Sequence, residues 1–495
     1  MMYGEEKSDS LIVAANLANN PQGAESVERR SGAKGNAEQP HMRRTQSRES
    51  MSQRLSRVRE AAKQRKKERF TALFHLLTAE ALENAFLSLS RKAAAGVDGV
   101  RWKDYAENLK VNIADLHRRL HQGSYRAQPG RRHYIPKADG KQRPLGIASL
   151  EDKIVQYALV KILNAVYEND FMGFSYGFRP GRSQHNALDA LATGLVRTNV
   201  NWVLDADISQ FFDKVSHEWL IRFIEHRIGD QRVIRLIRKW LTAGTSEEGE
   251  WRASEEGTPQ GAVISPLLAN IYLHYVFDLW AHQWRRRHAT GNVVMVRYAD
   301  DIVIGFDKRI DAQCFRIAMQ RRLKEFGLTV HPKKTRLMEF GRFAAENRAS
   351  RGKGKPETFN FPGFTHISGK DRSGRFMLIR KTRRDRMTAT LKAIKDGLRK
   401  RWHYSIPEQG KWLRRVVQGY LNYHSVPGNY PMMRKFRIYV TDLWRRALRR
   451  RSQQDDTTWT KANRLAAVWL PKVRVLHPWP VERFTARHPR QEPGA

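Results

Sequence analysis

Cysteine is almost absent from this sequence, since Cys314 is the only one among 495 residues. A single thiol cannot form an intramolecular disulfide, and it excludes zinc sites that are built from several cysteines. Residues 1–20 also lack the basic region, long apolar stretch and small-residue cleavage site of a secretory signal. Together these absences predict a protein of the reducing cytoplasm.

The sequence also has no long hydrophobic run, and it has too few acidic residues to balance its basic ones. No apolar stretch approaches the ~20 residues that a membrane-spanning helix needs, so we expect no membrane partner. Lys and Arg number 90 against 50 Asp and Glu, which gives a formal net charge of +40. This positive charge recurs along nearly the whole chain and favours a nucleic-acid partner. An inert basic surface is the alternative.

Composition and hydrophobic periodicity divide the chain into parts. The first is polar and poor in aromatic residues, which predicts a disordered arm. The next two combine amphipathic helices with short strands, and the fourth is strongly basic, with helical spacing of apolar residues over 380–451. The sequence therefore predicts an α+β chain that is followed by an all-α basic bundle. The arm spans residues 1–50, and a basic tail at 452–495 follows the bundle.

An acidic pair lies inside an apolar stretch, VVMVRYADDIVIGF, at residues 293–306. The flanking Val and Ile predict two buried strands, joined by a tight turn that carries Asp300 and Asp301. Adjacent carboxylates repel one another and lose hydration, so a hard cation such as Mg²⁺ is their natural partner. The alternative is a solvated Asp-rich turn.

A second acidic segment reads NWVLDADISQFFDKVSHEWL. Its first apolar residues predict a strand, and Asp207 follows near the strand end, which makes it the best candidate for a third metal ligand. The rings of Phe211 and Phe212 are suited to wall the sugar of a nucleotide. Packing in the hydrophobic core is the alternative explanation for both rings.

Two further segments carry candidate ligand-binding residues. Residues 131–147 predict a hairpin that brings Lys137 near Arg143, and two such cations suit a triphosphate. The glycines of the GTPQG segment admit the close approach of a ligand or base pair beside Gln260 and Gly261. Exposed charges on a solvated hairpin and a plain structured turn are the alternatives.

The last predicted helix of the bundle ends in the sequence WRRALRRR. Interleaved arginine and aromatic residues suit structured RNA, because planar groups stack on unpaired bases and cations meet phosphates. The candidate RNA-binding residues are Arg445, Arg446, Arg449 and Arg450. A solvated helix face is the alternative for any one of them.

The order of these motifs resembles that of the reverse transcriptase and maturase proteins of bacterial group II introns. The resemblance covers about residues 50–490 and rests on the segments GVDG, YIPKADGKQRPLGI, FSYGFRPGRSQH, DADISQFFDKVSH, GTPQGAVISPLLANIYL, RYADD, HPKKTR and FPGFTH. It implies a right-hand polymerase, with an N-terminal extension and fingers at 51–200 and a palm at 201–370, followed by a thumb or maturase domain at 371–451. Pro362 stands where the family commonly has Leu.

The resemblance also implies roles for individual residues. Asp207, Asp300 and Asp301 would hold two Mg²⁺ ions, while Lys137 and Arg143 would grip the incoming triphosphate. Phe212 would exclude a ribose 2′-hydroxyl, with Phe211 as the fallback if the alignment is shifted by one. Gln260 and Gly261 would lie beside the nascent base pair.

The function implied is an RNA-directed DNA polymerase that also binds its parent intron RNA and assists splicing and mobility by target-primed reverse transcription. Its partners would be that RNA, an RNA template with a DNA primer, target DNA and dNTP, with a homodimer left open. No Cys pairs or His-Asn-His pattern follow residue 451, so a fused DNA endonuclease is not expected. The alternatives are a splicing cofactor with an unused polymerase site, or a reverse transcriptase of a retron, diversity-generating or antiviral system.

Overall fold

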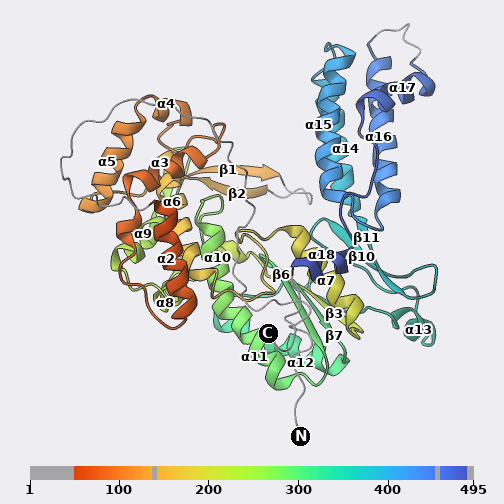
Figure 1. Ribbon diagram of the computed structural model, residues 1–495, viewed down its shortest axis with the longest axis horizontal. Coiled ribbons are helices and arrows are strands. Elements are labelled where there is room, and N and C mark those ends of the chain that lie inside the picture. The colour runs from red at the N-terminus through yellow and green to blue at the C-terminus, as the bar shows by residue number, and fades with distance from the viewer. Residues whose placement is uncertain (1–49, 137–141, 452–456, 488–495) are drawn as a thin grey trace, which may run out of the picture.

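The computed structural model describes residues 50–136, 142–451 and 457–487. Figure 1 shows a helical region with a small sheet on one side, a second sheet covered by helices in the middle, and an upright helical bundle. One hydrophobic core runs through the first two regions, and the bundle has a separate core of its own. The predicted combination of helices and sheets followed by an all-α bundle is confirmed.

Amphipathic helices build the N-terminal region around α6, whose apolar residues are buried on nearly every side. Capping side chains fix several helix starts, as where Ser149 accepts a hydrogen bond from the Asp152 amide. The helices are α2 (Met51–Gln64), α3 (Ala79–Ser88), α4 (Trp102–Glu107), α5 (Leu109–Gln122), α6 (Leu150–Tyr167), α7 (Gln184–Arg197), α8 (His217–Glu225) and α9 (Gln231–Thr242).

The small sheet contains the predicted hairpin. Strands β1 (Gly130–Pro136) and β2 (Gln142–Ile147) pair antiparallel, and β1 also pairs with β4 (Thr245–Glu247), which continues into β5 (Glu250–Arg252). Lys137, predicted at the turn of this hairpin, lies outside the described residues.

The central sheet is antiparallel and has the order β6-β7-β3-β8. Its strands are β3 (Trp202–Asp207), β6 (Val293–Tyr298), β7 (Asp301–Phe306) and β8 (Arg336–Glu339). Val, Ile and Met side chains on both faces of β6 and β7 are buried, because helices cover the sheet. Helices α7 and α12 (Arg309–Glu325) pack against this sheet, and α10 (Ser265–Leu273) and α11 (Leu279–His288) precede β6. No helix in the described part of the chain is long and apolar enough to cross a membrane.

A third sheet, of order β11-β10-β9, connects the central sheet to the bundle. It follows the short helix α13 (Ala344–Ala349) and is formed by β9 (Phe359–Phe361), β10 (Phe364–Lys370) and β11 (Phe376–Thr382). Pro362 and Gly363 occupy the turn between the first two strands, where Gly363 has a φ of 76°. A turn with proline followed by a left-handed glycine is favourable, so Pro362 removes no hydrogen bond from the strand ladder.

The bundle differs from its predicted limits at both ends. It begins at α14 (Arg384–Arg399), because residues 380–382 finish strand β11 and are not helical as predicted. It continues through α15 (Ile406–His424) and α16 (Tyr430–Arg449) to α17 (Trp459–Trp469), which adds Ala466 to the bundle core beyond the predicted end at 451. The last helix, α18 (Pro480–Arg487), returns to pack on α7.

Candidate functional site

The predicted acidic residues meet at one edge of the central sheet. Strand β3 ends at Asp207 and strand β7 begins at Asp301, and the two residues are direct cross-strand partners. Opposed residues of an antiparallel pair point to the same face, with their Cβ atoms about 4.5–5.5 Å apart. Asp300 lies next to them in the turn, after Ala299, whose φ of 57° is left-handed. The strand pairing thus gathers the three carboxylates that the sequence singled out.

A buried arginine supports the turn from behind. Arg297 is fully buried, and its Nη1 donates to the Ala299 carbonyl at 3.0 Å. Its Nε donates to Asp278 Oδ1 at 2.7 Å, and Asp278 is also fully buried. Further bonds run to Asn270 Oδ1 at 3.1 Å and Ser175 Oγ at 2.7 Å. The acidic turn therefore rests on a charged network with no access to water.

The surroundings of the acidic cluster raise the pKa of Asp301, Asp300 and Asp205. Burial, followed by repulsion from Asp300, Asp207 and Asp205, raises the pKa of Asp301 to about 7. Burial also raises the pKa of Asp300, and the pKa of Asp205 rises to about 6 mainly for the same reason. Asp301 is exposed on one side, so its loss of hydration is partial. Nearby cations therefore do not balance the negative charge of the cluster.

One lysine partly compensates the cluster. The ammonium of Lys334 donates to Asp207 Oδ2 at 2.9 Å, and this hydrogen bond is the main cause of a raised pKa of Lys334. Within the described ranges, no three His, Cys, Asp or Glu side chains are arranged, as they stand, to hold a metal ion. Carboxylate oxygens are nevertheless the donors that Mg²⁺ prefers, so the donor chemistry of the cluster fits this ion, although side chains must turn to complete the site.

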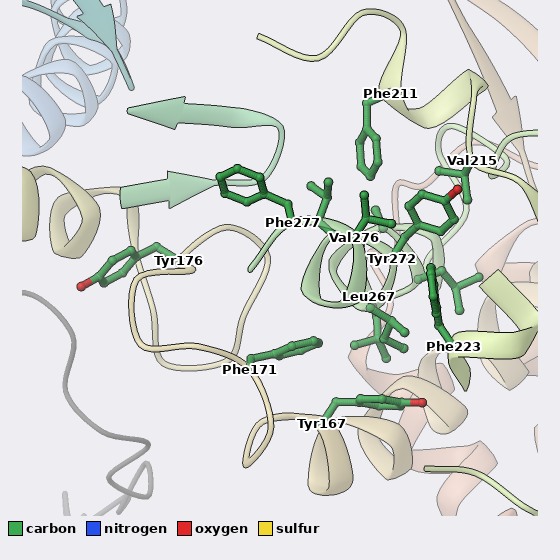
Figure 2. Close-up of a cluster of buried hydrophobic side chains, with 14 of the residues drawn as sticks. Tyr167, Phe171, Tyr176, Phe211, Val215, Phe223, Leu267, Tyr272, Val276 and Phe277 are labelled. Atoms are coloured by element: carbon green, nitrogen blue, oxygen red, sulfur yellow. The ribbon is translucent and has the colours of Figure 1, made fainter. Parts of the chain in front are cut away.

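The two neighbouring phenylalanines have different surroundings. Phe211 is buried and packs toward Tyr272 in the core, as Figure 2 shows. Phe212 is half-buried and meets the exposed ring of Phe178 edge-on, with 6.5 Å between ring centroids. Of the two rings, Phe212 is therefore the one that is accessible to a ligand.

The hairpin and the GTPQG loop also meet beside the acidic cluster. Arg143 on β2 donates from Nε to Gln260 Oε1 at 2.9 Å, and Gln260 Nε2 donates in turn to Asp213. The positive charge of Arg143 lowers the pKa of Asp300, against the larger effect of burial. Gly261 has a φ of 108°, and a Cβ there would lie 3.0 Å from the Gly146 carbonyl oxygen. These contacts bring Arg143, Gln260 and Gly261 to the site.

The four candidate RNA-binding arginines lie far from this site along the bundle, and their surroundings differ. Arg445 is half-buried, donates to Asp442 Oδ1 at 2.9 Å and lies over the ring of Trp459. Arg446 also pairs with Asp442 but remains exposed, as do Arg449 and Arg450. Arg445 thus contributes to packing between α16 and α17, and the other three face solvent.

Comparison with known proteins identifies the region that holds the acidic cluster. A family model described as reverse transcriptase (RNA-dependent DNA polymerase) matches residues 135–366, which include both strands that carry the carboxylates. This match assigns a reverse transcriptase domain to residues 135–366. The chain is 43% identical to Protein YkfC of Escherichia coli (strain K12) over 206 residues, which cover 41% of this chain and 54% of that protein.

Two more relatives link the reverse transcriptase domain to introns. Group II intron-encoded protein LtrA of Lactococcus lactis subsp. cremoris is 37% identical over 223 residues, which cover 44% of this chain and 37% of the relative. An uncharacterized 91 kDa protein in the cob intron of Schizosaccharomyces pombe is 42% identical over 172 residues, 34% of this chain and 21% of the relative. The matched regions therefore span about half or less of these relatives.

Three further residues lie at the acidic cluster that were not among the site residues predicted from the sequence. Arg297 directly precedes the acidic turn, and an arginine inside an apolar strand is a signal that a buried carboxylate lies nearby. Lys334 is more than a hundred positions from Asp207, and no local pattern reports their contact. Asp205 lies two residues before Asp207, which places both side chains on the same face of β3.

Proposed function

We propose that the chain is an RNA-directed DNA polymerase that also binds the RNA of its parent group II intron, assisting splicing and target-primed mobility. The observation that carries the proposal is the opposed pair Asp207 and Asp301, with Asp300 adjacent, inside a reverse transcriptase domain. The substrates in this proposal are dNTP and an RNA template with a DNA primer. Target DNA and intron RNA are the further partners, which fits a net charge of +40.

The proposed reaction joins the primer 3′-oxygen to the α-phosphorus of the dNTP and releases pyrophosphate. Two Mg²⁺ ions, when bound by Asp207, Asp300 and Asp301, would supply charge that activates the hydroxyl and balances the phosphates. Arg143 is placed to bind the triphosphate, and Gln260 fixes its guanidinium. The Lys334 ammonium donates to Asp207 and holds this carboxylate in position at the end of β3.

In this proposal the three regions of the fold take the parts of a right hand. Residues 51–200 form the N-terminal extension and fingers, 201–370 the palm, and the bundle from α14 to α17 the thumb or maturase domain. A primer extension assay tests the polymerase activity. The assay combines the purified chain with an RNA template, a DNA primer, dNTP and Mg²⁺. Absence of any extended primer would contradict the proposal.

Replacing Phe212 with alanine should admit ribonucleotides. Because Phe212 is the half-buried ring at the cleft, its loss removes the proposed wall against the 2′-hydroxyl. We expect the preference for dNTP over rNTP to fall by about tenfold or more, which corresponds to roughly 1.4 kcal/mol of discrimination. Competing dNTP and rNTP in single-nucleotide extension measures this ratio.

The matched control is Phe211→Ala, which creates a cavity in the core because Phe211 is only 3% exposed. We expect this variant to lose about 3–5 kcal/mol of stability, with the discrimination of the folded fraction unchanged. Lost discrimination in Phe211→Ala and intact discrimination in Phe212→Ala would mean that the assignment is shifted by one residue.

Replacing Arg446, Arg449 and Arg450 with glutamine should weaken RNA binding without unfolding the bundle. All three side chains are exposed, and glutamine is a good helix former. Removal of one arginine–phosphate interaction should flatten the dependence of log K on log salt by about 0.7–0.9, so the slope of the triple variant should fall by up to about 2–3. Binding of group II intron RNA measured over a salt series tests this expectation. An unchanged slope would return these arginines to a solvated helix face.

A further inference from the structure

A groove lies between helices α14 and α16 of the bundle, with a volume of about 540 Å³. It is lined by the C-terminal parts of both helices, and these parts lie at the end of the bundle away from the central sheet (Figure 1). The volume falls within the range of about 300–1,000 Å³ that is typical of small-ligand sites. The groove is therefore large enough for a nucleotide and separate from the acidic cluster.

The floor of the groove is apolar and aromatic. Leu398 of α14 and Leu443 and Ala447 of α16 line it, together with Trp402 in the turn after α14. The Trp402 side chain is half-buried. In the described part of the chain its ring stacks on no other ring and no cation, in contrast to Trp412, which carries Arg401 at 4.4 Å. The indole thus offers a free aromatic surface.

The rim of the groove is positively charged. Lys395 and Arg399 line it from α14, and Arg446 and Arg450 line it from α16. Asp396 is the one acidic residue of the lining, and all five side chains are exposed. Arg446 pairs with Asp442 at 2.7 Å, whereas Arg399 and Arg450 form no ion pair within the described residues. Two cations are therefore available to an anion at the rim.

We propose that this groove binds one unpaired nucleotide of a structured RNA, with the base on Trp402 and the flanking phosphates on Arg399 and Arg450. The inference rests on the proposed function, in which the chain binds intron RNA, and it assigns that binding to a defined site. An aromatic floor with a cationic rim is the combination that recognises extruded bases, since every base has a face that stacks and a phosphate that carries charge.

The position of the groove decides which part of the RNA it can take. The templating nucleotide has to lie beside the acidic cluster on the central sheet, whereas the groove is at the far end of the bundle. Its occupant is therefore a base outside the polymerase cleft, such as a bulged nucleotide in a folded RNA. Paired bases are excluded because both faces of a paired base are stacked within the helix.

The test compares two RNA hairpins that differ by one unpaired 2-aminopurine bulge. The full-length protein is first saturated with an RNA template and DNA primer, so that the polymerase cleft is occupied. We expect the bulged hairpin to bind about tenfold more tightly than the paired one, within the range that stacking of one base contributes. We also expect the 2-aminopurine fluorescence to be quenched on binding. Trp402→Ala should abolish both effects, and Trp402→Phe should retain most of them.

Matched controls lie on the same helix. Tyr439 is an exposed aromatic residue of α16 outside the groove, so Tyr439→Ala should bind as the wild type does. Arg434 is exposed but does not line the groove, so Arg450→Gln should weaken binding of the bulged hairpin severalfold more than Arg434→Gln. The comparison of these two arginine variants tests the proposed groove even where Trp402→Ala fails to fold.

Two results would overturn the inference: equal affinity of the wild type for both hairpins, or a bulge preference that survives Trp402→Ala. Primer extension by the same samples reports on the polymerase separately. A wild type that extends no primer but prefers the bulge would refute the polymerase and leave the groove standing.

Discussion

Asp301→Asn or Asp207→Asn should lower primer extension on an RNA template by about a thousandfold or more, and Asp300→Asn should act in the same direction. The two carboxylates are cross-strand partners at the acidic edge of the sheet, and exchanging one for an amide removes a charged ligand from the proposed Mg²⁺ site. A loss of about 4 kcal/mol of transition-state stabilisation corresponds to this factor. Near wild-type extension by Asp301→Asn would remove the carboxylates from the mechanism.

Thermal unfolding provides a readout for the same variants that does not depend on turnover. The pKa of Asp301 is raised to about 7, whereas an unfolded Asp ionises near 3.9. Between about pH 4 and 7 the folded protein holds a proton that the unfolded chain has lost, so stability decreases as the pH rises through this window. At pH 8 the cost is fully present, and Asp301→Asn removes it.

We therefore expect Asp301→Asn to unfold at a higher temperature than the wild type at pH 8 without Mg²⁺, and at about the same temperature near pH 4. Added Mg²⁺ should stabilise the wild type, because a ligand that binds only the folded state raises the melting temperature. The variant should lose most of this response. An equal Mg²⁺ response of both proteins would argue against metal binding at these residues.

Asp278→Asn should destabilise the protein by about 3–5 kcal/mol, since it leaves the buried Arg297 without its counter-charge. For a large domain each kcal/mol corresponds to roughly 2–4 °C, so the melting temperature should fall by about 6–20 °C. Arg297 also holds the Ala299 carbonyl, so the acidic turn should loosen and primer extension should fall even where the fold survives.

The control for Asp278→Asn is an ion pair with similar residue types at the surface. Arg222 and Glu218 pair at 2.7 Å on α8 with both side chains more than half exposed, so Glu218→Gln should change stability by less than about 1 kcal/mol. Equal effects of the two substitutions would mean that the Arg297 network contributes no more than a surface pair does.

The sequence predicted the acidic hairpin well because its signals are local. Alternating turn and strand propensities located β6 and β7 within a residue or two, and the carboxylates stood at the turn between them. The strand at Trp202 and the hairpin at residues 131–147 followed from similar patterns. The two hairpins pair strands that are close in the chain, so periodicity and turn residues suffice for them. The strand at Trp202 pairs with β7 and β8, about a hundred residues further along, so the sequence predicted the strand but not its partners.

Contacts between segments that are distant in the chain could not be predicted from the sequence. The ion pair of Lys334 with Asp207 and the role of Arg445 beside Trp459 depend on how elements pack, which no local pattern records. The sequence predicts that the bundle ends at residue 451, because a polar stretch follows. The burial of α17 becomes apparent only when Ala466 meets the core of the bundle.

Asp189 of α7 interacts with two arginines that are distant from it in the sequence. Arg483 of α18 donates to its Oδ1 at 2.9 Å, and Arg380 of β11, just before the bundle begins, lies 3.7 Å from the same oxygen. The segments that precede and follow the bundle are thus fastened to one point on one helix, at its base (Figure 1). Because the bundle is attached at one end, a small rotation at the attachment displaces its far end by a larger distance. Since a helix of 20 residues such as α16 is about 30 Å long, a rotation of about 10° at α7 carries the far end through roughly 5 Å.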